Sequence, residues 1–264
     1  VAWLDGAIPT SPLVLDGTLV VVGLTTDRGC TVSAYTESGE TAWSGPDLAG
    51  QCLPLGYDDG HVIVATGARQ DGQLVWLDRA TGVAAGTFPL PSAATTGPVG
   101  WTSEPGAVVV GTETGLVVAG PADAPKLLAR LETDVWVTSI APVDATLLAA
   151  STAATAEEGF GTRVLRVRAA GVGPTLSLTS IGTLNVPDPM RAALVAAGTW
   201  GTSSTSEDAH WWCKNGLISS GGAHWLKGWD AVTGVAVVDV TETAADNSGL
   251  ALGDDGRIYS GGAH

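Results

Sequence analysis

The side chains best suited to binding a partner lie close together in the last quarter of the chain. Five of the ten tryptophans fall between residues 200 and 229, beside a polar run from Thr199 to Cys213. An indole offers a flat apolar face and one N–H donor, so a group of indoles can stack on sugar rings or on another protein's apolar side chains. The candidate binding residues are Trp200, His210, Trp211, Trp212 and Trp225.

The alternative for this region is ordinary packing, with tryptophans filling gaps between strands and Thr199–Cys213 forming a long inserted loop. The pair Trp211-Trp212 favours binding, because adjacent strand residues point to opposite faces and one packed face explains only one of them. Both interpretations stay open on the sequence alone.

Residue types that bind zinc or copper also occur here, but their spacing is weak. His210 and Cys213 form one HxxC pair and His224 lies nearby, yet no second group of ligand-type residues completes a site. The run Asp58-Asp59-Gly60 lacks the alternating oxygen ligands and distant glutamate of a calcium loop, so it predicts a turn. We expect no metal and no cofactor.

Catalytic motifs are missing from the sequence. It holds no GxSxG elbow, no HExxH pair, no phosphate-binding glycine loop and no CxxCH haem site. We therefore expect no catalytic residues, and a protein that is not an enzyme.

The charge of the chain limits its partners. Twelve Lys and Arg residues stand against 27 Asp and Glu, which gives −15 at pH 7 with no run of like charges. Nucleic acids and anionic membranes attract cationic faces, so neither is an expected partner. No apolar run reaches the roughly 18–20 residues that cross a bilayer, so direct membrane insertion is not expected.

The chain holds three cysteines. A disulfide between Cys30 and Cys52 would close a loop worth roughly 3 kcal/mol, whereas Cys213 has no obvious partner. Disulfides persist in oxidising compartments, and lysine is scarce here. The sequence therefore favours an extracytoplasmic location, whether periplasmic, cell-surface or secreted.

Behind these residues lies a repeating pattern of short strands. The 36 glycines and 14 prolines indicate many turns, and abundant Val and Thr favour strands. Apolar runs meet at glycine-containing turns in groups of four, every ~40–50 residues, as in propeller blades. The four complete groups are predicted at Ile8–Leu15, Thr18–Leu24, Thr31–Tyr35 and Glu40–Trp43; at Cys52–Tyr57, His61–Thr66, Gln73–Leu77 and Val83–Phe88; at Thr96–Thr102, Ala107–Gly111, Gly115–Ala119 and Lys126–Leu131; and at Val135–Ala141, Thr146–Ser151, Thr162–Arg168 and Thr175–Ser180.

A fifth group begins near Arg191–Ala197. Its remaining three strands are predicted within Leu217–Val240, with a tight turn at Ala231–Gly234. The opening of that stretch recurs as Arg257–His264, inside a sixth group that starts at Gly249–Gly253.

The repeats predict an all-β fold, a β-propeller of four-stranded antiparallel blades. We expect a single domain over residues 1–264 with about six blades, or a portion of a seven- or eight-bladed ring. The N-terminal run Val1–Gly6 looks like a last strand, and it is expected to complete the last, incomplete blade.

Two turns and one hairpin carry a resemblance to a known family. Val75–Gly82 (VWLDRATG) and Gly228–Gly234 (GWDAVTG) resemble the ALDAxTGxxxW turn of pyrroloquinoline-quinone-type propeller repeats. Ser11–Gly23 (SPLVLDGTLVVVG) resembles the family's SPVVADGVVYVG hairpin. Trp43 matches the family's blade-docking tryptophan, and Phe88 stands in its place in the second group; the later groups lack it.

The resemblance implies a propeller and leaves several functions open, because the family includes quinone dehydrogenases, outer-membrane assembly lipoproteins and pilus-tip propellers. The dehydrogenases are longer, and many carry a vicinal cysteine pair that this sequence lacks. The expected function is a non-catalytic scaffold that mediates protein–protein interaction in an extracytoplasmic assembly. The alternatives are a propeller that binds glycans through its tryptophans, and a quinone-dependent dehydrogenase or a domain of one.

Overall fold

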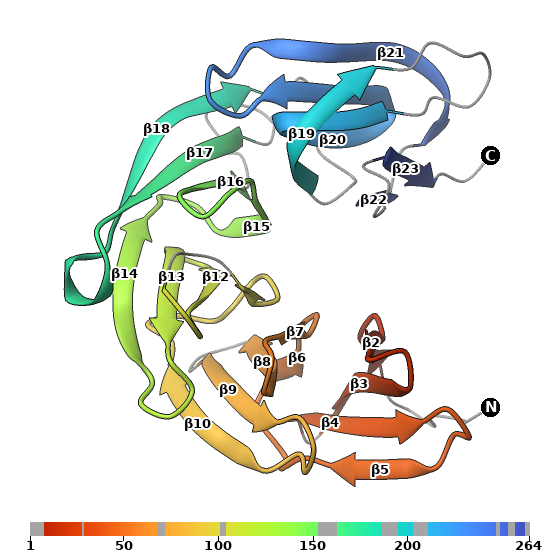
Figure 1. Cartoon of the computed structure of the whole chain (residues 1–264), viewed down its shortest axis with the longest axis vertical. Coiled ribbons are helices and arrows are strands. Elements are labelled where there is room, and N and C mark those ends of the chain that lie inside the picture. The colour runs from red at the N-terminus through yellow and green to blue at the C-terminus, as the bar shows by residue number, and fades with distance from the viewer. Residues whose placement is uncertain are drawn as a thin grey trace. The chain divides into compact units, whose positions relative to one another are not determined.

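The computed structural model describes residues 8–27, 29–67, 72–100, 104–152, 163–185, 195–202, 211–246, 249–252 and 257–261. Side chains are described only within residues 10–184 and 228–236. The described residues form strands β1 to β23 and one short 3₁₀ turn, Gly173–Thr175. They fall into two compact units, one holding β1–β14 and the other β15–β23 (Figure 1).

The first unit contains three antiparallel sheets, each a meander of consecutive strands. The first sheet holds β1 (Ile8–Pro9), β2 (Leu13–Leu15), β3 (Leu19–Thr26), β4 (Gly29–Thr36) and β5 (Thr41–Ser44). The second holds β6 (Gln51–Cys52), β7 (Gly56–Tyr57), β8 (His61–Gly67), β9 (Gln73–Asp78) and β10 (Ala84–Pro89). The third holds β11 (Val99–Gly100), β12 (Val108–Thr112), β13 (Gly115–Gly120) and β14 (Lys126–Glu132).

The predicted first strand of each of the first two groups is split in two. β1 and β2 both pair with β3, and β6 and β7 both pair with β8. Pro12 lies in the first gap and Pro54 in the second. Proline has no N–H for the ladder, so pairing is interrupted there while the chain keeps its direction.

The second unit begins with a sheet of β15 (Val137–Pro142), β16 (Leu147–Thr152), β17 (Arg163–Ala170) and β18 (Ser177–Asn185). With it, all four groups of four predicted from the repeats are present as four separate antiparallel sheets. The expected pairing of the N-terminal strand with the last blade involves residues 1–7, which lie outside the described residues.

The prediction for the last third of the chain is wrong in detail. The fifth sheet holds β19 (Val195–Thr202), β20 (Trp211–Asp230), β21 (Ala236–Asp246), β22 (Gly249–Leu252) and β23 (Arg257–Gly261). The three short strands expected within Leu217–Val240 are therefore only two, the end of β20 and the start of β21. The hairpin of β22 and β23 was expected to open a separate sixth blade, but β23 pairs with β20.

The expected number of strands was wrong because β20 changes its pairing partner along its length. Its ladder with β19 ends at Ser219, and its ladder with β21 begins at Ala223. The Gly221-Gly222 pair therefore lies where pairing passes from one neighbour to the other. Glycine inside a strand weakens the ladder without reversing the chain, and register shifts accompany it here.

The core lies between successive sheets, and the second sheet shows why. On β8, Val62 and Val64 belong to a cluster shared with the first sheet, whereas Ile63 and Ala65 belong to a cluster shared with the third. Side chains alternate between the two faces of a strand, so a sheet covered on both faces needs a continuous apolar run rather than an alternating one. The run HVIVATG has this pattern.

One tryptophan fastens the first sheet to the turn of the second. Trp43 of β5 is buried, and its Nε1 donates to the carbonyl of Arg79, 2.9 Å away. Its ring lies so close to Gly82 that a Cβ there would overlap Cε3. Gly82 also has a φ of +72°, so this turn needs glycine for both space and conformation.

The corresponding contact in the second unit uses an arginine. Arg166 of β17 donates through Nη1 to the carbonyl of Val232, in the turn between β20 and β21. A Cβ on Gly234 of that turn would lie 2.9 Å from the Cζ of Arg166. A guanidinium is planar and donates hydrogen bonds, so it can cover the turn glycine as the indole does in the first unit. The sequence did not reveal this substitution.

The two turns are held by matching carboxylates. Asp78 accepts hydrogen bonds from the N–H of Ala80, the N–H of Thr81 and the hydroxyl of Thr81. The Thr81 hydroxyl is the main reason that the pKa of Asp78 lies below its ordinary value of 3.8. Asp230 accepts the same three kinds of bond, and the N–H of Thr233 is the main cause of its lowered pKa, against partial burial that raises it.

We predict that replacing Gly82 with alanine destabilises the protein more than the same change at Gly17. Both glycines have a left-handed φ, +72° and +69°, which costs alanine roughly 1–2 kcal/mol. Only Gly82 faces a ring; no atom lies within 4 Å of a Cβ at Gly17. The overlap with Trp43 should add about 1–3 kcal/mol. Urea unfolding followed by circular dichroism measures the difference, and equal losses in the two variants would contradict the docking role of Trp43.

A second prediction concerns acid. Because the folded pKa of Asp78 and of Asp230 is lowered, their stabilising effect is present above pH 3.8 and disappears as the pH falls through the folded pKa values. The double variant D78N/D230N keeps an acceptor at each turn but loses the charge. It should be less stable than the wild type at pH 7, and the gap should close by about pH 2. A gap that stays constant in urea titrations from pH 7 to pH 2 would refute this assignment.

Candidate binding surface

Four of the five candidate binding residues lie on strands of the fifth sheet. Trp200 is in β19, and Trp211, Trp212 and Trp225 are in β20. His210 falls outside the described residues. The predicted inserted loop Thr199–Cys213 is therefore wrong at both ends, because residues 199–202 and 211–213 belong to paired strands. Threonine and tryptophan, which make up five of these seven residues, favour strands, and the polar composition of the whole run concealed this preference.

The strand register brings three of these tryptophans to one end of β20. Trp200 is paired with Cys213, so its backbone lies next to that of Trp212, which is paired with Gly201. Trp225 lies further along β20, where its partner is Thr241 of β21. The backbone thus groups Trp200, Trp211 and Trp212, and separates Trp225 from them along the strand.

A different surface of the first unit was not singled out from the sequence. Val14 of β2 and Tyr57 of β7 pair with Val20 and Val62, the second residue of β3 and of β8 respectively. They therefore hold equivalent positions in the first and second sheets. Both residues are exposed, with 59% of the surface of Val14 and 57% of that of Tyr57 accessible to solvent. Large apolar side chains left exposed at a repeated position indicate a surface that another molecule can cover.

A pocket of about 360 Å³ lies between the second and third sheets, beside the turn that follows β7. Its polar lining comes from the β7–β8 turn, through Asp58, Asp59 and His61, and from Asp123 in the β13–β14 connection. Its apolar lining is Ala85, Pro121 and Ala122. All of the lining segments belong to the first unit, and Figure 1 shows β7, β8, β10 and β13 in it.

The carboxylates of the pocket have different roles. Asp58 holds the turn, because its Oδ1 accepts from the N–H of Gly60 at 2.9 Å and from the N–H of His61 at 2.8 Å. Nδ1 of His61 also lies 2.9 Å from this oxygen. Asp59 is exposed and takes no part in these bonds. The sequence prediction of a turn at Asp58-Asp59-Gly60 is consistent with this geometry, but the partner segment that completes the pocket comes from the third sheet.

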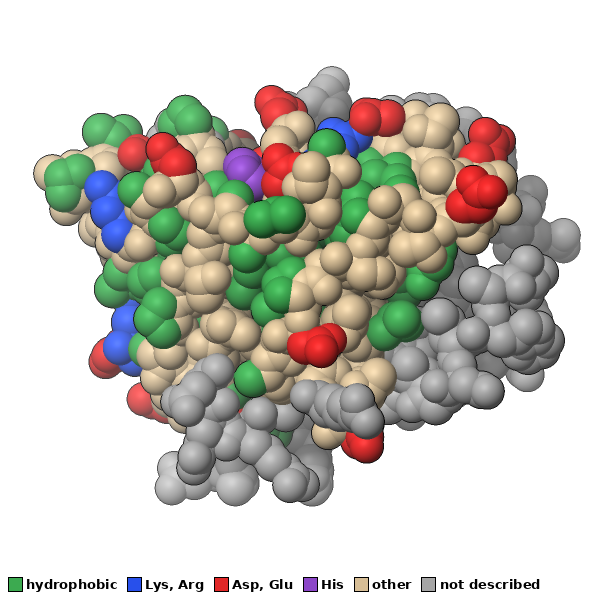
Figure 2. All heavy atoms as spheres, turned by 90° about the horizontal axis from the view of Figure 1, so that it is seen from below, with side chains coloured by type: hydrophobic (Ala, Val, Ile, Leu, Met, Phe, Trp, Pro, Cys, Tyr) green, Lys and Arg blue, Asp and Glu red, His purple; other side chains and the backbone are tan. Residues whose placement is uncertain are grey.

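Acidic side chains are not confined to this pocket. On the face seen in Figure 2, red acidic side chains are scattered among green hydrophobic ones, and blue basic ones are few. No group of three or more His, Cys, Asp or Glu side chains in the described ranges is arranged to hold a metal ion.

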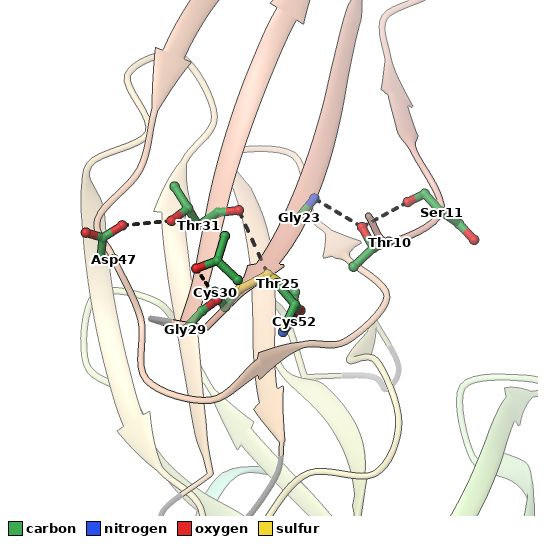
Figure 3. The surroundings of a disulfide bond; sticks show 10 residues. Thr10, Ser11, Gly23, Thr25, Gly29, Cys30, Thr31, Asp47 and Cys52 are labelled. Atoms are coloured by element: carbon green, nitrogen blue, oxygen red, sulfur yellow. Dashed lines mark hydrogen bonds between the residues drawn. A yellow bond between two sulfur atoms is a disulfide. The ribbon is translucent and has the colours of Figure 1, made fainter. Parts of the chain in front are cut away.

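Cys30 of β4 and Cys52 of β6 are bonded to each other, with Cα atoms 4.9 Å apart (Figure 3). The bond joins the first sheet to the second, and Cys30 is fully buried. The N–H of Cys52 donates to the hydroxyl of Thr25 at 2.8 Å, which ties β6 to β3 as well. The disulfide and Trp43 therefore both link the first sheet to the second.

No family model matches the chain, and no curated protein matches it in sequence. Among solved structures, BamB from Moraxella catarrhalis superposes with a TM-score of 0.54 at 16% identity, over 96% of this chain and 70% of that one. The Dos1 propeller superposes with a TM-score of 0.56 at 14% identity, over 93% of this chain and 74% of that one.

Identity at this level shows the fold alone. The chain has a β-propeller fold built from four-stranded antiparallel sheets, as the repeats predicted, and it is consistent with about six blades. In the described part of the chain there is no helix long and apolar enough to cross a membrane.

We predict that removing the disulfide weakens the first unit. The variant C30A/C52A should lose about 3 kcal/mol of unfolding free energy, because the bond closes a loop between residues 22 apart in sequence. Urea denaturation of variant and wild type measures this loss. Thiol titration of the denatured, unreduced protein is the control, and it should find the single thiol of Cys213. Three titratable thiols, or an unchanged unfolding free energy, would contradict the prediction.

Proposed function

We propose that this protein is a non-catalytic propeller scaffold that binds another protein in an extracytoplasmic assembly. The observation that carries the proposal is the pair of exposed apolar side chains, Val14 and Tyr57, at equivalent positions of two neighbouring sheets. Tyrosine is enriched in the buried centres of protein interfaces, where it supplies apolar area and one hydrogen-bonding group. Repetition of the feature in two blades makes a chance exposure a poor explanation.

Two further features support the proposal. Trp136, just before β15, is 54% exposed, and it offers a second aromatic anchor in the other unit. The Cys30–Cys52 disulfide favours an oxidising compartment, because cytosolic reductants keep most thiols reduced. The sequence contains none of the catalytic motifs named above, and this supports a binding role over a catalytic one.

The tryptophan-rich strands are a proposed additional contact. It comprises Trp200, His210, Trp211, Trp212 and Trp225, of which the first, third and fourth are grouped by the strand register. The same grouping favours a second candidate function, glycan binding by stacking of sugar rings on indoles. Titration with a glycan panel separates the two, since stacked sugars shift tryptophan emission whereas a purely protein-binding chain leaves it unchanged.

The scaffold proposal predicts that exposed aromatic residues control partner capture. The tagged whole chain is incubated with an extracytoplasmic extract of its source, cross-linked, and its partners are identified by mass spectrometry. In Y57S or W136S the recovery of a specific partner should fall about tenfold, as expected when an interface anchor is lost. The matched control is V172S, which removes an apolar side chain that is 59% exposed in the β17–β18 connection.

Circular dichroism verifies that each variant keeps the β-sheet signal of the wild type. Undiminished recovery of every partner by both Y57S and W136S would refute the proposed surface. Loss of recovery in V172S alone would move the interface to a different part of the second unit.

A further inference from the structure

The pocket between the second and third sheets has the features of an anchor site. Its walls are held at a fixed separation, because β10 and the β13–β14 connection touch directly below it. A Cβ on Gly86 of β10 would overlap the carbonyl oxygen of Ala122, so the backbones are already in contact there. A pocket of about 360 Å³ with rigid walls lies at the small end of ligand-binding cavities, which span roughly 300–1,000 Å³. It can hold one side chain or a small ligand.

The charges of the pocket select the occupant. Asp59 and Asp123 are exposed at its rim, and neither side chain forms a hydrogen bond or ion pair among the described residues. No Lys or Arg is part of its lining. Arg79, on the β9–β10 turn, is already paired with Asp16 of the first sheet. A cationic group entering the pocket would therefore meet unneutralised carboxylates.

The apolar part of the lining indicates which kind of cationic group fits the pocket. Ala85, Pro121 and Ala122 offer no ligand atoms for a bare metal ion, but they can pack against a methylene chain. Lysine and arginine combine an apolar stem with a charged head, which is the combination that this lining accommodates. The lining does not include Tyr57. Tyr57 pairs with Val62, whose side chain packs toward the first sheet, so the Tyr57 side chain lies on the face of the second sheet opposite the pocket.

From this geometry we propose that the pocket receives a lysine or arginine side chain of the partner protein. The inference rests on the proposed scaffold function and names the chemistry of the partner's segment. It makes Asp59 and Asp123 the residues that determine which segment binds.

The test is affinity selection of a random decapeptide library on the immobilised whole chain. Selected peptides should be enriched about tenfold in Lys or Arg at one position. On D59N/D123N this enrichment should vanish. The charge-matched control is D27N/E113Q. It removes two exposed carboxylates that do not line the pocket, one in the β3–β4 turn and one in the β12–β13 turn. It should select the same peptides as the wild type.

A selected peptide is then synthesised with its basic residue or with norleucine, which keeps the stem and removes the charge. The norleucine peptide should bind the wild type about tenfold more weakly, and the two peptides should bind D59N/D123N equally. A library without basic enrichment, or equal loss of binding in D27N/E113Q, overturns the inference.

The two proposals fail separately. If a partner is captured from the extract through Tyr57 but its recovery is the same with D59N/D123N, the scaffold function stands and the pocket assignment falls. If no variant changes the recovery of any partner from the extract, the scaffold function itself falls, whatever the library selects.

Discussion

Close approach of one sheet to a glycine-containing turn of the next sheet is the constraint on which the described structure depends. A sheet whose two faces are both covered can be approached by its neighbour only where the turn has no side chain in the way. Gly82 meets this condition under Trp43, and Gly234 meets it under Arg166. The carboxylates of Asp78 and Asp230 then hold each turn in the shape that exposes the glycine. Indole and guanidinium are interchangeable here because both are flat and both donate to a turn carbonyl.

The same constraint creates the surface available for binding. The second and third sheets are in contact where Gly86 lets β10 approach the carbonyl of Ala122. Next to this contact, turns of the two sheets enclose a pocket. The pocket therefore belongs to the junction rather than to either sheet. Turns that hold themselves together, such as the one at Asp58, leave neighbouring residues like Asp59 free to face a partner.

Charge and covalent bonding complete this picture. The acidity of the chain is dispersed over its surface, so electrostatic attraction by itself would favour many cationic partners weakly. Specificity requires a place where carboxylates stand beside a shaped apolar surface, and the junction of the second and third sheets offers one. The Cys30–Cys52 bond joins the first sheet to the second, at the junction that precedes this site.

Much of the architecture could be read from the amino-acid order. Apolar runs separated by Asp-Gly, Ser-Gly and Thr-Gly turns predicted the first four sheets, because turn chemistry and strand alternation are local properties. The division of Leu217–Val240 into three short strands was wrong, since a change of strand partner leaves no local signal and only the ladders of β20 reveal it.

The site was harder to predict for a physical reason. Tryptophan density drew attention to residues 200–229, whereas Tyr57 and Asp123 have no unusual local pattern. What unites Asp59 and Asp123 is a contact between two sheets, brought about by packing of segments more than 60 residues apart in the sequence. Sequence by itself determined the repeated strand-and-turn unit, because that unit depends on neighbours along the chain. Which side chains share a pocket, and that Arg166 covers the turn glycine Gly234, was decided only by how the sheets pack.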